Sequence, residues 1–459
     1  MTMTTINRRS VLSMIGGSLT IAETTTVVNS LQNEAATGPT IFASGYGGNL
    51  IAVDALTGER LWERSGPGSP RSSPIVVDGT LYVGSSYERL YALDATTGEN
   101  VWRFDEPGPI SSSPTVVDGT VYVGALDNTL YAVDAETGDE EWEFDLPEDR
   151  VTSSPTVHND TVYAGSRDHT LDAVNAETGE HEWTFFDPED WVDSSPAIYD
   201  DTLYVAAYDE ALYAVDPETG EQERVVTDSI EGSPSPVFVD DTLYIHGDNL
   251  YALDPQTGEE QWSYDTSWSG DLLSPTVADG LVFTGGDGLY AVDAKTGEEQ
   301  WALTDITPGD TSPTVYDGMV YTGVGGSDQT MYGVHAGTGE IEWELETDFD
   351  EYSGGSATVV ADPENGDSVD SRVLLGTFNH HHETTTSMAD LPSVNSAESS
   401  NASSSGSSGT RASSSNSSAA DADSDDDGLP GFGVPAAVSG LGTTVYMLKR
   451  RLETEENDG

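Results

Sequence analysis

A Thr-Gly pair recurs eight times along this chain, at intervals of 38 to 42 residues. Its glycines are Gly58, Gly98, Gly138, Gly179, Gly220, Gly258, Gly297 and Gly339. A repeat of about 40 residues is typical of a propeller or a solenoid, in which each repeat is one small unit that packs against its neighbours. Most of the chain is therefore expected to be one structural unit repeated eight times.

Within each repeat the pattern is that of β-strands joined by tight turns. In the third repeat, Asp118-Gly119 lies between two runs of β-branched and aromatic residues, which is a strong hairpin signal. Thr137-Gly138 lies between the last two runs and supplies a residue that tolerates a positive φ. The body shows no helical periodicity of useful length. These features predict an all-β fold, an eight-bladed β-propeller of four-stranded antiparallel blades over residues 37–383.

The two ends of the repeat region are expected to close the ring together. The first repeat lacks the Ser-Ser-Pro run that precedes most others, and the runs 355–361 and 371–378 have no repeat after them. N- and C-terminal strands would then complete one blade and leave no exposed sheet edge. The runs 40–44 and 372–378 compete for the same place in that blade, and the sequence does not choose between them.

A tryptophan follows the Thr-Gly pair at a fixed distance in most repeats. The pattern Ala-x-Asp-x-x-Thr-Gly-x-x-x-Trp resembles the tryptophan-docking repeat of the pyrroloquinoline-quinone-type (PQQ-like) propellers. The tryptophans at this place are Trp62, Trp102, Trp142, Trp183, Trp262, Trp301 and Trp343. The repeat after Asp216 departs from the pattern, with Arg224 at the tryptophan position. We interpret these indoles as structural wedges between neighbouring blades rather than as a site, because buried aromatic rings stabilise strongly.

The chain is strongly acidic, with 82 Asp and Glu against 16 Lys and Arg and a formal net charge of −66. Such self-repulsion is mostly screened when the Debye length falls to about 3 Å, near 1 M salt. The composition therefore predicts a halophilic protein, from a salt-loving archaeon. Nucleic acid is excluded as a partner because phosphate binding needs a basic surface. Cysteine is absent, which excludes disulfides and thiolate metal sites.

The N-terminus, residues 1–36, resembles a twin-arginine export signal. Arg8 and Arg9 precede a short, mildly apolar run that is too short to span a bilayer. The alternative is a disordered basic N-terminus.

The C-terminus carries a predicted stalk and a predicted anchor. Residues 384–428 are rich in Ser and Asp and are expected to be disordered. In the segment 429–459, residues 431–448 form an uncharged run followed by Lys449, Arg450 and Arg451, which would hold that end in the cytoplasm. Pro430-Gly431-Phe432 resembles the PGF-type sorting signal of archaeal surface proteins, whose tail is exchanged for a lipid anchor. The alternative is an ordinary membrane helix. Either reading places the body on the outer side of the membrane.

Three sequons are candidate glycosylation sites, which suits a surface protein. They begin at Asn159, Asn401 and Asn416. His380 to His382 could ligate a metal, but we interpret them as part of a linker because adjacent histidines rarely converge on one ion. No metal site is predicted.

One face of the propeller is expected to carry the function. The Asp-Gly and Thr-Gly turns would lie on one face and the longer, more variable loops on the other, where binding residues usually sit. The candidate binding residues on the loops are Arg71, Arg89, Arg150, Arg167, Trp191 and Trp268, with Tyr46, Tyr87, Tyr208, His169 and His246 on the same face. The arginines could receive an anionic or carbohydrate-like partner, or could simply pair with the surrounding acids.

Two functions of different classes remain open. The first is a binding or scaffold module for protein or glycan partners at the cell envelope, which resembles the lipoprotein propeller of bacterial outer-membrane assembly and uses no cofactor. The second is a PQQ-dependent dehydrogenase, for which the family resemblance implies quinone and calcium at the propeller axis. The sequence singles out no catalytic residues, and we favour the binding module.

Overall fold

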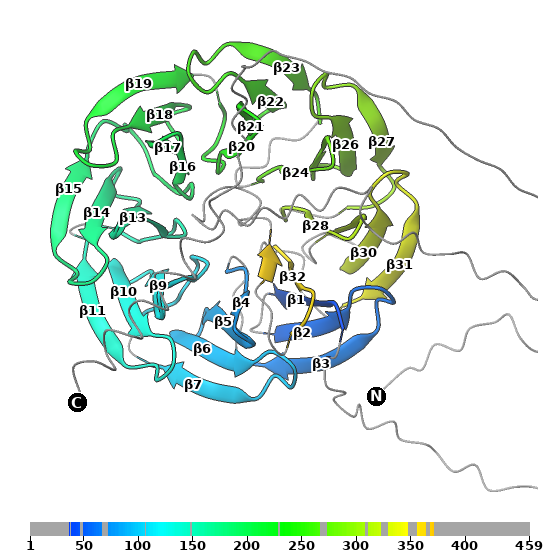
Figure 1. Cartoon of the computed structure of the whole chain (residues 1–459), viewed down its shortest axis with the longest axis horizontal. Coiled ribbons are helices and arrows are strands. Elements are labelled where there is room, and N and C mark those ends of the chain that lie inside the picture. Colours follow the sequence, from blue (N-terminus) through cyan, green and yellow to red (C-terminus); the bar gives the residue numbers. More distant parts are fainter. Residues whose placement is uncertain are drawn as a thin grey trace, which may run out of the picture.

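The computed structural model describes residues 36, 38–45, 49–66, 72–105, 107–146, 149–227, 230–266, 273–307, 311–322, 329–347, 356–363 and 368–370. These residues form eight antiparallel β-sheets arranged as blades around a central axis (Figure 1). The predicted all-β, eight-bladed propeller with four-stranded blades is confirmed.

Each blade has four strands from the axis to the rim, and blade 1 carries a fifth strand described below. Blade 1 consists of β32 (Thr358–Val360), β1 (Thr40–Gly45), β2 (Asn49–Asp54) and β3 (Arg60–Ser65). Blade 2 consists of β4 (Ile75–Val77), β5 (Thr80–Ser85), β6 (Arg89–Asp94) and β7 (Asn100–Phe104). Blade 3 consists of β8 (Thr115–Val117), β9 (Thr120–Gly124), β10 (Thr129–Asp134) and β11 (Glu140–Asp145). Blade 4 consists of β12 (Thr156–His158), β13 (Thr161–Gly165), β14 (Leu171–Asn175) and β15 (His181–Phe185).

The second half of the ring repeats this order. Blade 5 consists of β16 (Ala197–Tyr199), β17 (Thr202–Ala206), β18 (Leu212–Val215) and β19 (Gln222–Thr227). Blade 6 consists of β20 (Val237–Val239), β21 (Thr242–His246), β22 (Leu250–Leu253) and β23 (Glu260–Tyr264). Blade 7 consists of β24 (Thr276–Ala278), β25 (Leu281–Thr284), β26 (Leu289–Asp293) and β27 (Glu299–Leu303). Blade 8 consists of β28 (Thr314–Tyr316), β29 (Met319–Tyr321), β30 (Thr330–His335) and β31 (Ile341–Glu346).

The middle strands of a blade are buried on both sides, because each blade is covered by its two neighbours. Every residue of β13 is buried, whereas β11 alternates around the buried Trp142 and exposes its glutamates. This explains why the middle strands read as continuous apolar runs and the rim strands as polar ones.

Strands from both ends of the described chain complete blade 1. β32 pairs with β1, with Thr40 opposite Val360 and Phe42 opposite Thr358. The run 40–44 therefore takes the second place in the blade, next to the innermost β32. β33 (Ser368–Asp370) pairs with the other edge of β32 as a fifth strand. The competing run 372–378 lies outside the described residues.

The hairpin turns have the geometry that their residues favour. Asp118 and Gly119 both have a left-handed φ, at 49° and 84°, as a two-residue turn between twisted strands requires. At the Thr-Gly turn, one carboxylate oxygen of Asp134 accepts bonds from the backbone N–H and the hydroxyl of Thr137, at 2.7 and 2.8 Å. The repeated Asp and Thr thus hold the turn.

Each docking indole joins its own blade to the next. The indole N–H of Trp142 donates to the carbonyl of Ala176 at 2.9 Å, and its ring lies against Gly179, where a Cβ would come within 2.9 Å of the ring. Equivalent bonds are donated by Trp62, Trp102, Trp183, Trp262, Trp301 and Trp343. The bond from Trp343 reaches Ala55 in blade 1 (3.0 Å) and closes the ring.

Arg224 takes over the indole's hydrogen bond at the seam between blades 5 and 6. Its guanidinium donates to the carbonyl of Pro255 at 2.6 Å and to the hydroxyl of Tyr204 at 2.9 Å. Phe238 fills the apolar space beside it, with its ring 4.6 Å from that of Tyr204. The departure from the repeat is therefore compensated locally.

Candidate functional site

The connections between strands lie on two opposite faces of the ring. Strands within a blade are antiparallel, so successive connections alternate between the faces. The Asp-Gly and Thr-Gly turns share one face, as the sequence predicts. The connections from the second to the third strand and from blade to blade share the other, which we call the loop face.

Serine side chains at the start of the innermost strands bond from blade to blade. The backbone N–H of Ser113 donates to the hydroxyl of Ser154 at 3.0 Å, and that of Ser154 donates to Ser195 at 3.3 Å. The same bond joins Ser73 to Ser113, Ser195 to Ser235, Ser274 to Ser312, Ser312 to Ser356, and Ser356 to Ser73. We call these contacts the serine belt. Sequence reasoning treated Ser-Ser-Pro only as a strand marker and missed that its hydroxyls hold the hub together.

The dehydrogenase alternative requires ligands for calcium near the axis. Within the described ranges, no group of three or more histidine, aspartate or glutamate side chains is placed to hold a metal ion. Calcium takes about six to eight oxygen ligands, with carboxylates prominent among them. The serines at the hub are engaged with neighbouring blades. The described residues thus hold no carboxylate cluster of the kind that a calcium-bound quinone needs.

The candidate arginine Arg89 is paired with an acid on the loop face. Arg89 binds Asp105 at 2.7 Å, and Asp105 also binds Arg103 at 2.7 Å. Arg150 is exposed. Arg71, Trp268 and Tyr46 lie outside the described residues, so their relation to this group is not described.

Arg167, Trp191 and Tyr208 come together where blades 4 and 5 meet. The Arg167 guanidinium lies 4.4 Å from the Trp191 ring centre and binds both carboxylate oxygens of Asp193, at 3.1 and 2.7 Å. Burial opposes the charge on Arg167, but the bonds and charge of Asp193 still hold its pKa above the ordinary value. Trp191 meets Tyr208 edge to face, with ring centres 5.9 Å apart. The positive charge of the cluster is thus already neutralised by Asp193.

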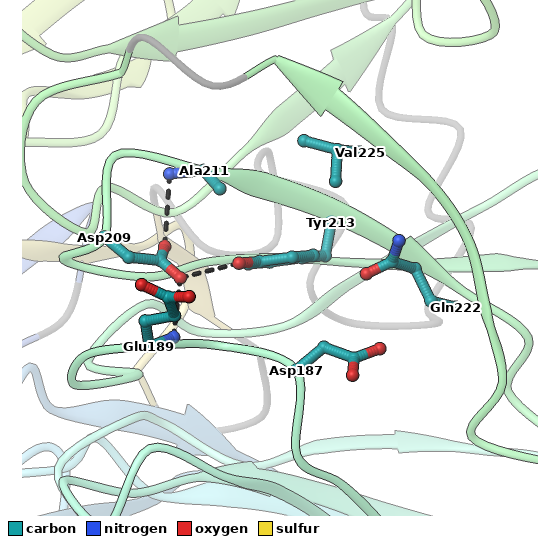
Figure 2. A pocket seen from close by; sticks show the side chains of 7 residues that line it. All are labelled: Asp187, Glu189, Asp209, Ala211, Tyr213, Gln222 and Val225. Atoms are coloured by element: carbon teal, nitrogen blue, oxygen red, sulfur yellow. Dashed lines mark hydrogen bonds between the residues drawn. The ribbon is translucent and has the colours of Figure 1, made fainter.

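A hollow of about 410 Å³ lies where the loop after β15, which carries Trp191, meets the β17–β18 connection, which carries Tyr208 (Figure 2). We call it the blade 4–5 hollow. It is lined by Asp187, Glu189, Asp209, Ala211, Tyr213, Gln222 and Val225, which come from the loop after β15, from the β17–β18 connection, and from β18 and β19. The lining is thus acidic on one side and apolar on the other.

Asp209 is the anchored carboxylate of the hollow. It accepts the Tyr213 hydroxyl at 2.6 Å and the backbone N–H groups of Glu189 and Ala211 at 2.8 and 3.2 Å (Figure 2). Burial and the bond to this carboxylate raise the pKa of Tyr213 well above its ordinary value, so the phenol stays protonated and keeps donating. Asp187 and Glu189, by contrast, are exposed, and neither forms an ion pair within the described part of the chain.

Exposed apolar side chains lie in the lining of this hollow, at Val225, and close in the chain to its lining residues Asp187 and Glu189, at Phe186 and Trp191. Phe186 is 73% exposed, Val225 is 42% exposed and Trp191 is 39% exposed. The other large exposed apolar residues, Leu56, Tyr87, Val101 and Ile341, lie on blades 1, 2 and 8. Sequence reasoning named Trp191 but missed Phe186 and Val225. The available signal was local: Val225 directly follows the docking position, where several repeats have a polar residue such as Glu63 or Glu143.

Two other candidate residues, His246 and Asn159, are not displayed on the loop face. His246 is completely buried at the end of β21 and binds Thr266 at 3.2 Å, so it is not displayed on the loop face. Blades 2 and 3 have Gly84 and Gly124 at the equivalent position, where a loop passes close to the glycine. In blade 6 the buried imidazole of His246 fills this space. Asn159 is exposed in the β12–β13 turn, on the face opposite the loops.

Several sequence predictions fall outside the described residues. These are the export signal, the stalk, the C-terminal anchor, the histidines 380–382 and the sequons at Asn401 and Asn416. The part of the chain that the structure describes has no helix long and apolar enough to cross a membrane.

Comparisons with known proteins agree with the propeller. The sequence matches the family described as outer membrane protein assembly factor BamB over residues 17–104, 47–264 and 246–406. No curated protein matches the sequence significantly.

Solved structures with the same fold have different activities in their names. BamB from Moraxella catarrhalis matches with a TM-score of 0.54 and 16% identity, over 66% of this chain and 97% of that chain. The computationally designed Ika8 protein matches with a TM-score of 0.54 and 17% identity, over 68% and 97%. Quinohemoprotein alcohol dehydrogenase from Comamonas testosteroni matches with a TM-score of 0.54 and 16% identity, over 66% and 74%. At these identities the likeness shows the fold alone.

Proposed function

The chain belongs to the family described as outer membrane protein assembly factor BamB, and from that premise we propose that it is a binding module that holds a protein partner at the cell surface. An assembly factor acts by contacting other proteins, and we propose only this mode of action for the chain. The mode of action needs a displayed surface and no reactive group.

The observation that carries this proposal is a hollow at the junction of blades 4 and 5, with exposed apolar side chains in its lining and in the chain segment next to that lining. Phe186, Val225 and Trp191 lie on neighbouring segments of two rigid blades. Apolar side chains that gather beside a hollow are characteristic of interaction sites, whereas isolated ones are ordinary surface. The serine belt and the docking indoles hold the two blades in place, so the surface is presented ready-made.

The location at the cell surface is supported by the sequence. A twin-arginine-like start and an uncharged run closed by Lys449, Arg450 and Arg451 are expected in a protein that is exported and then anchored at its C-terminus. The acid excess suits a salt-rich exterior. In a fractionation experiment the full chain should stay with the membrane and be cut by protease on intact cells. A chain ending at residue 428 should appear in the medium, and its retention would contradict C-terminal anchoring.

Capture from an envelope extract at high salt tests the binding function. The full protein should retain specific proteins, and the double variant Phe186→Ser with Val225→Thr should lose at least one of them. The matched control is Leu56→Ser, which removes an equally exposed apolar side chain from the turn face of blade 1. If the double variant retains the same proteins as the parent, the junction is not the binding surface. If nothing is retained by the parent, the binding function itself is wrong.

A glycan partner and a dehydrogenase activity are tested in the same preparation. Capture that survives protease treatment of the extract but not glycan removal would identify a glycan. Added pyrroloquinoline quinone and calcium should give neither a bound chromophore nor dye reduction, because the described residues do not fit the metal. A stoichiometric chromophore with alcohol-dependent dye reduction would overturn the binding proposal.

A further inference from the structure

We propose that the blade 4–5 hollow receives a basic side chain of the partner protein, while apolar residues on either side of it cover Phe186 and Val225. This rests on the proposed binding function and adds the chemistry of the partner. The partner segment is thus an amphipathic one, with a lysine or arginine between apolar neighbours.

The charges of the hollow select a cation. Asp209 is already satisfied by three donors from Tyr213, Glu189 and Ala211. Asp187 and Glu189 add two more carboxylates with no cation paired to them within the described residues. Three like charges around one hollow repel one another, and this repulsion is relieved when a positive group enters. Arg167 is held by both oxygens of Asp193, and Arg224 of β19 donates to Tyr204 and to the carbonyl of Pro255.

The hydrogen-bonding groups of the hollow also favour a cation over a sugar. Its free groups are almost all acceptors, because the Tyr213 hydroxyl is committed to Asp209 and only the Gln222 amide adds donors. An ammonium or guanidinium has donors only and so matches such a lining. A sugar hydroxyl must both donate and accept. The volume of about 410 Å³ is large enough for one long side chain.

The apolar rim explains why the partner is a protein segment rather than a free cation. Val225, which lines the hollow, is 42% exposed, and Phe186, which directly precedes the lining residue Asp187 in the chain, is 73% exposed. The aliphatic stem of lysine or arginine would lie along such a surface while its charged head reaches the carboxylates. Charge alone would give weak, salt-sensitive binding, whereas apolar contact persists at high salt.

Two peptides that differ by one charge test the proposal. The probe is acetyl-Gly-Leu-Lys-Phe-Gly-amide, and its partner carries norleucine in place of lysine. Binding is measured by calorimetry on the full protein at moderate and at high salt. The lysine peptide should bind at least about fivefold more tightly than the norleucine peptide, and raising the salt should shrink that ratio.

Matched variants locate the binding. Asp187→Asn with Glu189→Gln should abolish the preference for lysine, whereas Glu136→Gln with Glu177→Gln removes two exposed charges from the turn face and should not. Phe186→Ser should weaken both peptides by about tenfold, and Leu56→Ser should weaken neither. All six substituted residues are exposed, so the variants are expected to fold like the parent.

The outcomes separate this proposal from the binding function on which it rests. Equal binding of the two peptides, no binding of either, equal losses from the control variants, or preferential binding of maltotriose used as a glycan probe would each overturn the basic-side-chain proposal. If the parent protein captures no protein from the envelope extract, the binding function itself is overturned. If the parent protein captures a partner and every junction variant still captures it, the binding function stands and only the basic-side-chain proposal is refuted.

Discussion

At the scale of single residues, each blade seam depends on one side chain that donates a hydrogen bond to the next blade. Trp142 donates to the carbonyl of Ala176 and covers Gly179, and the other docking indoles repeat this contact. A residue at the seam therefore has two separable roles: it packs against the next blade, and it donates a hydrogen bond to a carbonyl of that blade.

Truncating Trp142 measures both roles. Trp142→Ala should lower the free energy of unfolding by about 3–5 kcal/mol, because it opens a cavity between blades 3 and 4. Trp142→Phe should cost less, because it keeps most of the packing and loses the bond to Ala176, which is worth about 1 kcal/mol. Urea denaturation at high salt measures both, with the exposed Val101→Ala as the control. A Trp142→Ala protein as stable as the parent would show that the indole is not a wedge.

Restoring the repeat pattern at Arg224 should destabilise the protein. Phe238 already fills the space of an indole, and Gly258 lies directly against the carbonyl of Val226. Arg224→Trp is therefore overpacked and should cost about 1–3 kcal/mol. Adding Phe238→Val should recover part of that loss, since the two changes share one cavity. Strictly additive losses in the double variant would contradict this account of the seam.

His246 makes part of the stability pH-dependent. Burial lowers the pKa of His246 to about 4, from an ordinary 6.5. The native state therefore holds the imidazole neutral, and the unfolded state takes up a proton more readily. This contribution is fully present above pH 6.5 and is lost as the pH falls from there through 4, by about 3 kcal/mol in all. The residue was predicted on the loop face from its position at a strand end, but burial depends on the neighbouring loops, which the sequence does not place.

A variant without the imidazole isolates this effect from the many carboxylates. His246→Gln should flatten the stability curve between about pH 7 and pH 4 relative to the parent, while both proteins share the background from Asp and Glu. Chemical denaturation at a series of pH values gives the difference. Parallel curves for the two proteins would mean that His246 is charged, or accessible, in the native state.

At the scale of elements, the turns were predictable and the contacts between blades were not. Asp118-Gly119 announces its hairpin because few other pairs adopt two successive positive φ angles. Asp187 follows the last strand of blade 4 and Val225 lies in blade 5, and their meeting in one hollow follows from how blade 4 packs on blade 5. The spacing of residues within one repeat does not predict the distance between residues of two neighbouring blades. The Ser-Ser-Pro run was visible as a marker, but its role in the serine belt requires the neighbouring copy.

The turn between β16 and β17 offers a stabilising substitution. Asp200 and Asp201 both have a positive φ, at 49° and 58°, where the equivalent turn of blade 3 has Asp118 and Gly119. A left-handed conformation costs a residue with a Cβ about 1 kcal/mol, and glycine avoids that cost. Asp201→Gly should therefore raise the unfolding free energy by roughly 0.5–1 kcal/mol, measured by urea denaturation. The reverse change, Gly119→Asp, should lower it by a similar amount, since a Cβ at Gly119 meets nothing within 4 Å. A change of the same sign in both variants would contradict this reading of the turns.

At the scale of the whole molecule, the ring is stable only if it closes. The repeat count and the unmatched runs at the two ends were enough to predict closure through blade 1. They were not enough to place the strands, because residues 40–44 and 372–378 have equally suitable patterns. The strand pairing places residues 40–44 in blade 1: β1 lies between β2 and β32, and Ile41 and Phe42 are completely buried there.

Removing β32 should therefore open the ring. A chain that ends at residue 347 loses the partner strand of β1, the bond from Ser356 to Ser73 and the bond from Thr358 to the carbonyl of Pro74. The bond from Trp343 to Ala55 would then hold blades 8 and 1 without the innermost strand. An uncovered edge of β1 would expose Ile41 and Phe42 and invite pairing with a second chain. We expect a lower and broader thermal transition and a concentration-dependent mass in sedimentation velocity. A chain that ends at residue 383 keeps β32 and should behave as a cooperative monomer, and equal behaviour of the two truncated chains would show that closure does not depend on the C-terminal strand.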